Sequence, residues 1–341
     1  MNKIVTFGEV MLRLKSPGHE RLFQSPVLEA RFGGGEANVA ASLALFGQHA
    51  VFVSALSDDL VGQAALRTLR GYGVDVSQVR RTGERTGIYF LETGADQRAS
   101  QVVYDRAGSA AAAMKPGDFP WEEIFRDAQW FHFTGITPAL SADCAAACLE
   151  AARAARAAGV KVSIDLNFRR KLWNYGAKAP DVMGGLVTKA DVLIANEEDI
   201  QLGLGLTTDA DPRRDGAETA FRKLAARTRE LYPNLSAVAI TLRESRSADR
   251  NGWSAMLADR KGFHVSRKYC LEDIVDRVGG GDSFAAGLIF GLLEFGDEAR
   301  ALEFAVAASA LKHSIPGDLN LVTREEVERL VAGDGSGRVQ R

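Results

Sequence analysis

Short apolar stretches alternate with longer stretches of helical periodicity over most of the chain. Apolar runs indicate strands at residues 3–7, 51–54, 130–133, 160–164, 192–195 and 237–241. Helices are predicted between them and towards the C-terminus, at residues 58–72, 141–158, 179–188, 213–231 and 298–312. Strands that alternate with helices pair through right-handed crossovers. This order therefore predicts an α/β fold with a mainly parallel central sheet and helices on both faces.

A β-rich excursion near the N-terminus departs from this alternation. Residues 11–32 read as extended pieces interrupted by prolines and glycine, and residues 86–93 and 100–104 are strand-like. The polar turn at residues 94–97 joins the last two into a predicted hairpin. We expect a single α/β domain over residues 1–332, followed by a flexible tail at residues 333–341 that begins Gly-Asp-Gly-Ser-Gly.

Composition narrows the class of protein. Hydrophobic residues make up 46% of the 341 positions and charged residues 25%, which is ordinary for a soluble globular protein. A net charge of −2 gives no electrostatic reason to expect nucleic acid or an anionic membrane as a partner. No apolar run reaches about 18 residues and no signal peptide is recognisable, so we expect a cytoplasmic protein. The three cysteines and five histidines show no disulfide or zinc spacing.

The most informative stretch is residues 276–284, Asp-Arg-Val-Gly-Gly-Gly-Asp-Ser-Phe, which opens into an apolar helix. Glycines at a helix N-terminus expose N–H groups at the positive end of the helix dipole, which predicts an anion hole made by Gly279, Gly280 and Gly281. A carboxylate in that place suits a general base that takes a proton from a hydroxyl during phosphoryl transfer, and Asp282 is the candidate. An Asp that merely caps the helix is the alternative.

Two common nucleotide motifs fit this stretch badly. A P-loop requires Lys followed by Ser or Thr after its last glycine, and here Asp282 stands in the place of the Lys. A dinucleotide fingerprint belongs to an early strand-turn-helix unit with an acidic partner, whereas this stretch lies near the C-terminus. The sequence therefore argues against a P-loop enzyme and against a dehydrogenase.

Further polar residues lie at positions where proteins with a parallel sheet usually bind their ligands. Residues 33–40 form a second junction between glycines and a helix, with Asn38 one turn into the helix. The Asn38 side chain could contact a ligand, cap the helix or face solvent. The hairpin carries Tyr89, Tyr104 and Arg106, which form either a binding surface or an exposed face. Two predicted strands end in polar clusters, at residues 165–169 and 196–199, at the edge where such sheets bind ligands.

Together these residues resemble the ribokinase-like (PfkB) family of carbohydrate kinases, over residues 4–330. The family's C-terminal signature reads Asp, Thr, a variable residue and then Gly-Ala-Gly-Asp, and it is matched at Asp276, Val278, Gly279, Gly281 and Asp282. Its N-terminal signature is matched at Gly34, Gly35, Asn38, Ala40 and Gly47. The departures are Arg277 in place of Thr, Gly280 in place of Ala, Glu36 in place of a small residue, Asp199 in place of Glu, and a long charged loop at residues 243–251.

The resemblance implies a fold and an activity. The fold would be ribokinase-like, with a small β-rich lid formed by about residues 10–33 and 86–107. The activity would be ATP- and Mg²⁺-dependent phosphorylation of a sugar, with Asp282 as the base. Within the family, residues 104–110, 134–141 and 165–169 are similar to kinases of 2-keto-3-deoxygluconate, a sugar acid that is phosphorylated at its terminal hydroxyl. A monovalent cation such as K⁺ and a homo-oligomer, dimeric or larger, are further implications.

The resemblance also assigns roles to residues. Substrate binding falls to Gly34, Gly35, Asn38, Tyr89, Tyr104, Arg106, Arg169 and Asp318. Nucleotide binding falls to Asn167, Asn196, Thr241, Arg243 and Ser245, and organisation of magnesium and phosphate to Asp199, with no direct protein ligand to the metal assigned. Arg106 and Arg169 would each supply a fork-shaped guanidinium to the sugar's carboxylate. The alternatives are a fructokinase, ribokinase, nucleoside kinase or 2-ketogluconate kinase, and a non-catalytic sensor of sugar acids or nucleotides.

Overall fold

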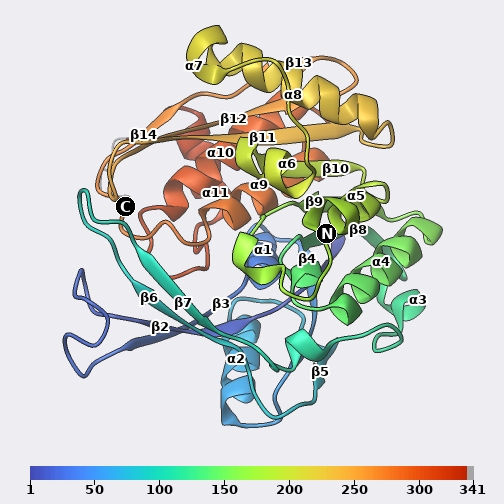
Figure 1. Ribbon diagram of the computed structural model, residues 1–341, viewed down its shortest axis with the longest axis vertical. Coiled ribbons are helices and arrows are strands. Elements are labelled where there is room, and N and C mark those ends of the chain that lie inside the picture. The colour runs from blue at the N-terminus through green and yellow to red at the C-terminus, as the bar shows by residue number, and fades with distance from the viewer. Residues whose placement is uncertain (336–341) are drawn as a thin grey trace.

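The computed structural model describes residues 1–335 and contains two sheets (Figure 1). The tail predicted to be flexible lies outside the described residues from position 336 onward. The larger sheet has the order β13-β12-β11-β10-β9-β8-β1-β4-β5, with β14 beside β12. Its strands are β1 (Lys3–Phe7), β4 (His49–Leu56), β5 (Val79–Arg81), β8 (Ala128–Thr134), β9 (Lys161–Asp165), β10 (Val192–Asn196), β11 (Ala237–Ser245), β12 (Asn251–Ala258), β13 (Phe263–Val265) and β14 (Tyr269–Leu271).

Pairing in the larger sheet is parallel from β11 to β5 and antiparallel where β12 joins β11, β13 and β14. The prediction of a mainly parallel sheet is therefore confirmed. Successive side chains of a strand point to opposite faces. Ile4 accordingly packs into one hydrophobic core, while Val5 and Phe7 pack into the other.

Helices cover both faces of this sheet. One core is shared with α1 (Gly35–Leu45), α2 (Leu60–Gly71), α9 (Gly280–Glu294), α10 (Glu298–Lys312) and α11 (Arg324–Val331). The other is shared with α3 (Trp121–Ile124), α4 (Ala142–Ala157), α5 (Ala179–Val187), α6 (Glu197–Gly203) and α8 (Ala217–Leu231). Short α7 (Pro212–Asp215) and the 3₁₀ turns η1 (Ala111–Ala113), η2 (Thr137–Ala139) and η3 (Arg170–Leu172) complete the helical elements of residues 1–335.

The helix that carries Asp282 is deeply buried. Every residue of α9 from Asp282 to Gly291 is buried, and α10 packs along it. A Cβ added at Gly287 would lie 2.8 Å from the Cα of Ala305, and one at Gly291 would lie 2.6 Å from the Cα of Ala301. These two glycines therefore let the helices approach more closely than larger side chains would.

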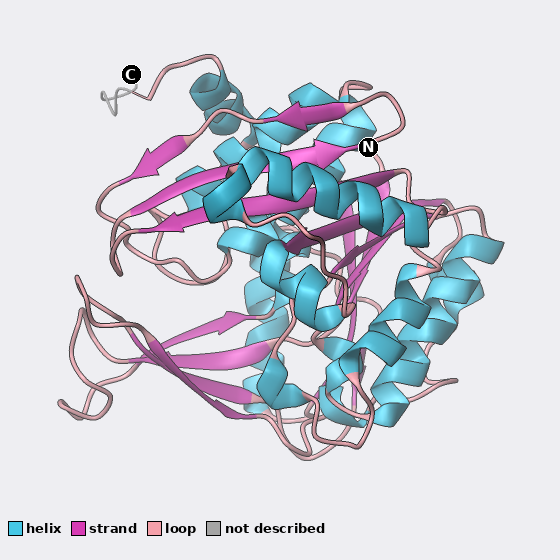
Figure 2. Cartoon of the chain, turned by 45° about the horizontal axis from the view of Figure 1, so that its top comes forward, coloured by secondary structure: helices cyan, strands magenta, loops and turns pink. Residues whose placement is uncertain are grey.

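The smaller sheet is the predicted β-rich excursion. Its order is β3-β2-β6-β7, with β2 (Met11–Lys15), β3 (Glu29–Gly33), β6 (Ile88–Glu92) and β7 (Gln101–Asp105). β2 and β6 are parallel and the outer pairs are antiparallel. Figures 1 and 2 show it standing apart from the main sheet, across from the carboxyl ends of the parallel strands. We call this sheet the lid.

Two expectations about secondary structure were wrong. The helix expected over residues 213–231 is divided at Gly216, whose φ of 84° is left-handed and ends helical geometry there. The charged loop expected at residues 243–251 is mostly a hairpin, because β11 continues to Ser245 and pairs there with Asn251 of β12. Only residues 246–250 form the turn.

Candidate active site

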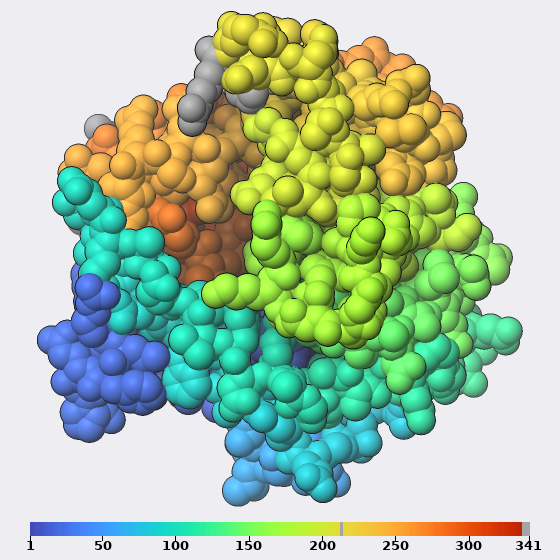
Figure 3. Space-filling view, viewed as in Figure 1, coloured from blue at the N-terminus to red at the C-terminus, as the bar shows by residue number. Residues whose placement is uncertain are grey.

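A cavity of about 350 Å³ lies between the lid and the carboxyl ends of the main strands. Figure 3 shows it as a hollow between the blue and cyan lid and the green and yellow body, with orange C-terminal residues at its floor. It is lined by fifteen of the eighteen predicted site residues: Gly34, Gly35, Asn38, Tyr89, Tyr104, Asn167, Arg169, Asn196, Asp199, Thr241, Arg243, Gly279, Gly281, Asp282 and Asp318. Gly280, Arg106 and Ser245 do not line it.

The N-terminus of α9 forms the floor. Gly279 is the N-cap residue with a left-handed φ of 82°, and a Cβ at this position would lie 1.9 Å from the carbonyl oxygen of Asp318. The amides of Gly279, Gly281 and Asp282 have no hydrogen-bond partner among residues 1–335. Gly280 differs from expectation, because its N–H donates to the Arg277 carbonyl at 3.3 Å. The anion hole therefore has free donors on both sides of Gly280 rather than at all three glycines.

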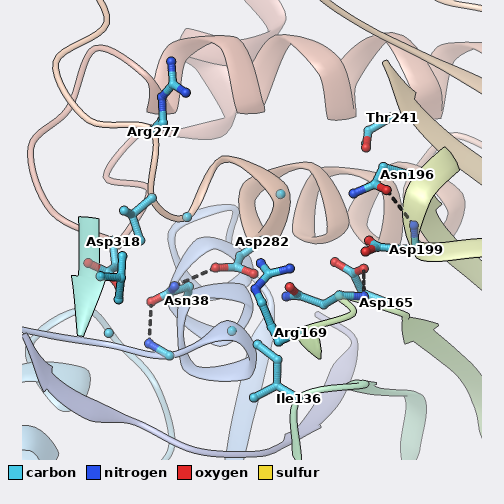
Figure 4. A pocket seen from close by; sticks show the side chains of 18 of the residues that line it. Asn38, Ile136, Asp165, Arg169, Asn196, Asp199, Thr241, Arg277, Asp282 and Asp318 are labelled. Atoms are coloured by element: carbon cyan, nitrogen blue, oxygen red, sulfur yellow. Dashed lines mark hydrogen bonds between the residues drawn. The ribbon is translucent and has the colours of Figure 1, made fainter. Parts of the chain in front are cut away.

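Asp282 lies in the first turn of α9 and is not the helix cap. Its Oδ2 accepts a hydrogen bond of 2.7 Å from Asn38 Nδ2, and Asn38 Oδ1 accepts one of 3.2 Å from the Gly34 amide (Figure 4). Burial raises the pKa of Asp282 from 3.8 to about 7; the bond from Asn38 opposes this rise and the charge of Asp318 adds to it. A carboxylate with a pKa near neutrality is suited to accept and release a proton at physiological pH.

Asp318 is held in place by the lid. Arg13 of β2 is completely buried and donates to Asp318 at 2.6 Å and to Asp276 at 2.5 Å. Tyr89 of β6 donates its hydroxyl to the other oxygen of Asp318 at 2.5 Å. Asp276 also accepts from the amide of Gly317 at 3.0 Å, so Arg13 joins the two loops that form the cavity floor.

The position of Arg106 differs from expectation. Its guanidinium forms a buried ion pair with Glu9 and lies 5.2 Å from the ring centroid of Tyr104, which itself lines the cavity. A buried guanidinium requires a charged partner, and Glu9, held also by Ser109 at 3.1 Å, supplies it. The expected pair of arginines is therefore not brought together in the cavity. Arg169 is the arginine of that pair that lines the cavity, where it reaches towards Asp282 (Figure 4).

The parallel strands β9, β10 and β11 bring the remaining polar groups to one edge. Asn196 caps α6 by accepting from the Asp199 amide at 2.8 Å, and Asp199 accepts from the Phe168 amide at 3.1 Å. Thr241 and Arg243 follow on β11. Ser245 is exposed at the far end of that strand, beyond the cavity, because β11 runs on past the sheet edge.

Two carboxylates at this edge suit a divalent cation. Burial, reinforced by the charges of Asp199 and Asp282, raises the pKa of Asp165 well above its usual range. Burial likewise raises the pKa of Asp199 to about 6. No cluster of three or more His, Cys, Asp or Glu side chains that could hold a metal occurs in the described part of the chain. Mg²⁺ is commonly held by one or two carboxylates together with substrate phosphates, and Asp165 and Asp199 match that arrangement.

Glu36, which stands where the family's N-terminal signature has a small residue, stabilises the structure around the site. It is buried and accepts hydrogen bonds from the Thr134 amide at 2.9 Å, the Thr134 hydroxyl at 2.7 Å and the Thr137 hydroxyl at 3.1 Å. It thereby ties α1 to the end of β8. Burial raises its pKa.

Comparison with known proteins identifies the family of this chain. The family model for the pfkB family carbohydrate kinases matches residues 1–323. The chain belongs to this family. A 2-dehydro-3-deoxygluconokinase from Thermotoga maritima has a solved structure with a TM-score of 0.92 and 47% identity, over 97% of this chain and 98% of that one. The predicted ribokinase-like fold is thus confirmed.

Two curated relatives extend the comparison. A 2-dehydro-3-deoxygalactonokinase of Haloferax volcanii is 34% identical over 98% of each chain. A 2-dehydro-3-deoxygluconokinase of Bacillus subtilis is 31% identical over 95% of this chain and 93% of its own. Kinases of the pfkB family use ATP and Mg²⁺ to phosphorylate sugars or sugar acids, and this chain shares that general activity. No helix within residues 1–335 is long and apolar enough to cross a membrane.

Proposed function

We propose that this protein transfers the γ-phosphoryl group of ATP to the terminal hydroxyl of 2-keto-3-deoxygluconate, giving the 6-phosphate. The observation that carries the proposal is the buried Asp282 carboxylate, with a pKa of about 7, beside free amides at the N-terminus of α9. The similarity to the Thermotoga maritima and Bacillus subtilis kinases supports this sugar acid in particular.

The chain's own groups account for the proton and the charge. Asp282 accepts the proton of the sugar's terminal hydroxyl while the oxygen of that hydroxyl forms a bond to the γ-phosphorus of ATP. At the same time the bond between the γ-phosphorus and the leaving oxygen of ADP breaks. The free amides of Gly279 and Gly281 stabilise the charge on the transferring group, a contribution of roughly 3 kcal/mol for each well-placed donor. Asp165 and Asp199 would hold Mg²⁺ together with the phosphates of ATP, and the ion would supply neutralisation of the phosphate charge.

The sugar acid fits between the lid and the floor. Arg169 forms no direct ion pair among residues 1–335, and its Nη1 donates to the Phe168 carbonyl at 3.0 Å. Its charge opposes the rise in pKa that burial causes at Asp165, Asp199 and Asp282, so it lies near these carboxylates without bonding to them. A guanidinium with free donors is the group that a sugar's own carboxylate would engage. Tyr104, backed by Arg106, and Asp318, backed by Tyr89 and Arg13, supply polar contacts to its hydroxyl and keto groups.

A second substrate is favoured by one comparison. The Haloferax volcanii relative is named for 2-dehydro-3-deoxygalactonate, which differs from the gluconate form in the configuration of one hydroxyl. The same carboxylate contact at Arg169 would serve both sugar acids. Discrimination between them would then depend on the polar groups along the lid.

The test is an ADP-release assay with Mg-ATP and a panel of acceptors: 2-keto-3-deoxygluconate, 2-keto-3-deoxygalactonate, 2-ketogluconate, fructose, ribose and adenosine. We expect turnover with the sugar acids and the highest kcat/KM with 2-keto-3-deoxygluconate. Asp282→Asn should lower kcat by about two to four decades with little change in KM. A preference for a neutral sugar would overturn the substrate proposal, and near-normal turnover by Asp282→Asn would remove Asp282 as the base.

A further inference from the structure

Two departures from the family signature, Arg277 and the hairpin at residues 243–251, touch each other in the structure. Arg277 stands two residues before the N-cap of α9, and its Nη2 donates to the carbonyl of Ala248 at 2.5 Å and to that of Ser247 at 3.2 Å. Its guanidinium points away from Asp282 (Figure 4). Arg277 is therefore directed at the β11–β12 turn rather than at the place where a phosphate would be transferred.

The turn also contacts the lid. The amide of Ala248 donates to the Asp96 carbonyl at 2.6 Å, and Asp96 lies at the tip of the β6–β7 hairpin. That tip is itself a tight turn, closed by two backbone hydrogen bonds between Ala95 and Arg98 of 3.0 and 2.8 Å. Figures 1 and 2 both show the hairpin tip next to the loops at that end of β11 and β12.

The other hydrogen bonds of the lid tip among residues 1–335 stay within the lid: for example, His19 bonds to the Gly94 carbonyl at 2.9 Å, and Arg98 donates to the His19 carbonyl at 2.6 Å and to Glu92 at 2.9 Å. A second cavity, of about 490 Å³, lies beside the contact and is lined by Asp96, by residues 246–247 and 249–251, and by residues 270–272. The lid tip is thus not packed against the body at this point. Arg277 holds the carbonyl of Ala248, the residue whose amide bonds to the lid. The Ile274 amide, which donates to the Asp249 carbonyl at 2.9 Å, also holds this turn.

We propose that Arg277 is a positioning residue that couples closure of the lid to the arrangement of the anion hole. Its backbone carbonyl accepts from the Gly280 amide, and its side chain holds the turn that bonds to the lid. A shift of the lid tip can therefore reach the glycines at the N-terminus of α9 through Arg277, in addition to the link that Arg13 makes from the lid strand β2 to Asp276 and Asp318. The proposal rests on the proposed kinase activity, because a closed lid keeps water away from the phosphoryl group.

The test compares Arg277→Thr, which restores the family's residue, with the matched control Arg246→Thr in the same turn. The Arg246 side chain makes no hydrogen bond or ion pair within residues 1–335. Hydrogen–deuterium exchange without sugar should show about tenfold faster exchange at residues 94–98 and 246–250 in Arg277→Thr and no change in the control. The KM of Arg277→Thr for the sugar acid should rise about tenfold, because fewer molecules have a closed lid. In a separate assay without sugar, its rate of ATP hydrolysis should increase severalfold for the same reason.

Ala248→Pro provides a second route, because it removes the N–H that bonds to Asp96 and keeps both carbonyls that Arg277 contacts. It should loosen residues 94–98 even if Arg277→Thr fails to fold. Unchanged exchange at the lid tip in both variants, or an unchanged ratio of ATP hydrolysis to sugar phosphorylation in a folded Arg277→Thr, would overturn the coupling. Absence of kinase activity in the unsubstituted protein would refute the proposed function instead, and the exchange experiment would still test the contact.

Discussion

Asp282→Asn should stabilise the folded protein at high pH while it removes the base. An acid whose pKa is higher in the folded state than in the unfolded state binds its proton more tightly when folded. Stability therefore falls as pH rises between the two pKa values. For Asp282 these are about 7 in the folded state and 3.8 in the unfolded state. At about 1.4 kcal/mol per pKa unit, the ionised side chain destabilises the folded protein by about 4 kcal/mol at pH 8.

Asparagine does not ionise, and its side-chain oxygen can still accept the bond from Asn38. The gain in stability should therefore be about 4 kcal/mol at pH 8 and about 1.6 kcal/mol at pH 5, where only the unfolded state of the unsubstituted protein is ionised. An unfolding entropy of about 2.1 cal/mol/K per residue gives about 0.7 kcal/mol/K for 341 residues. The expected rise in Tm is then about 6 °C at pH 8 and about 2 °C at pH 5.

Thermal and urea unfolding at both pH values, without nucleotide or sugar, measure this difference. Asp209→Asn is the matched control, because the Asp209 side chain is 86% exposed and its replacement should change stability by less than about 0.5 kcal/mol at either pH. An Asp282→Asn variant that is equally stabilised at pH 5 and pH 8, or destabilised at pH 8, would contradict the raised pKa and with it the assignment of Asp282 as a base poised near neutrality.

Three further substitutions test the site. Arg169→Lys should raise KM for sugar acids about tenfold with little change in kcat, because Lys lacks the bidentate fork; steady-state kinetics with an unchanged KM would exclude the carboxylate contact. Arg13→Met leaves the carboxylates of Asp276 and Asp318 buried without their cation and should destabilise the fold by about 3–5 kcal/mol in urea unfolding. A loss of less than about 1 kcal/mol would argue against the two ion pairs as a stabilising contact. Gly279→Ala places a Cβ against a backbone oxygen at a left-handed φ and should lower both Tm and kcat; normal values for both would show that the floor loop can move apart.

Local sequence signals account for much of what could be predicted. Apolar periodicity placed the strands and helices, and the two glycine-to-helix junctions identified Asn38 and Asp282, which the structure joins by a hydrogen bond. Arg13 and Glu9 were missed, although both are buried charges in direct contact with predicted site residues. A lone Arg in a strand has no local signature, and its partners lie 263 and 305 positions further along the chain.

Contacts between residues far apart in the sequence also explain the two wrong predictions about residues 243–251 and Arg106. The polar stretch from residue 243 onward reads as a loop, and only its pairing with β12 makes it a strand. Arg106 looks like a free anion-binding group in sequence, because its partner is not a neighbour along the chain. Its partner Glu9 comes from the loop after β1, 97 positions away. A weak signal existed, since Gly8-Glu9 follows directly on a buried strand.

The buried link between Arg13 and two aspartates near the C-terminus has a consequence for how the chain folds. Arg13 is synthesised among the first residues, and Asp318 among the last. While the protein is being made, the lid strand therefore carries an unpaired charge that cannot leave water, and the lid can complete its packing only when the final segment is released. Contacts across most of the chain slow folding. Folding of the lid should consequently be a late step, and C-terminal truncation before Asp318 should leave the N-terminal lid strands open to proteolysis.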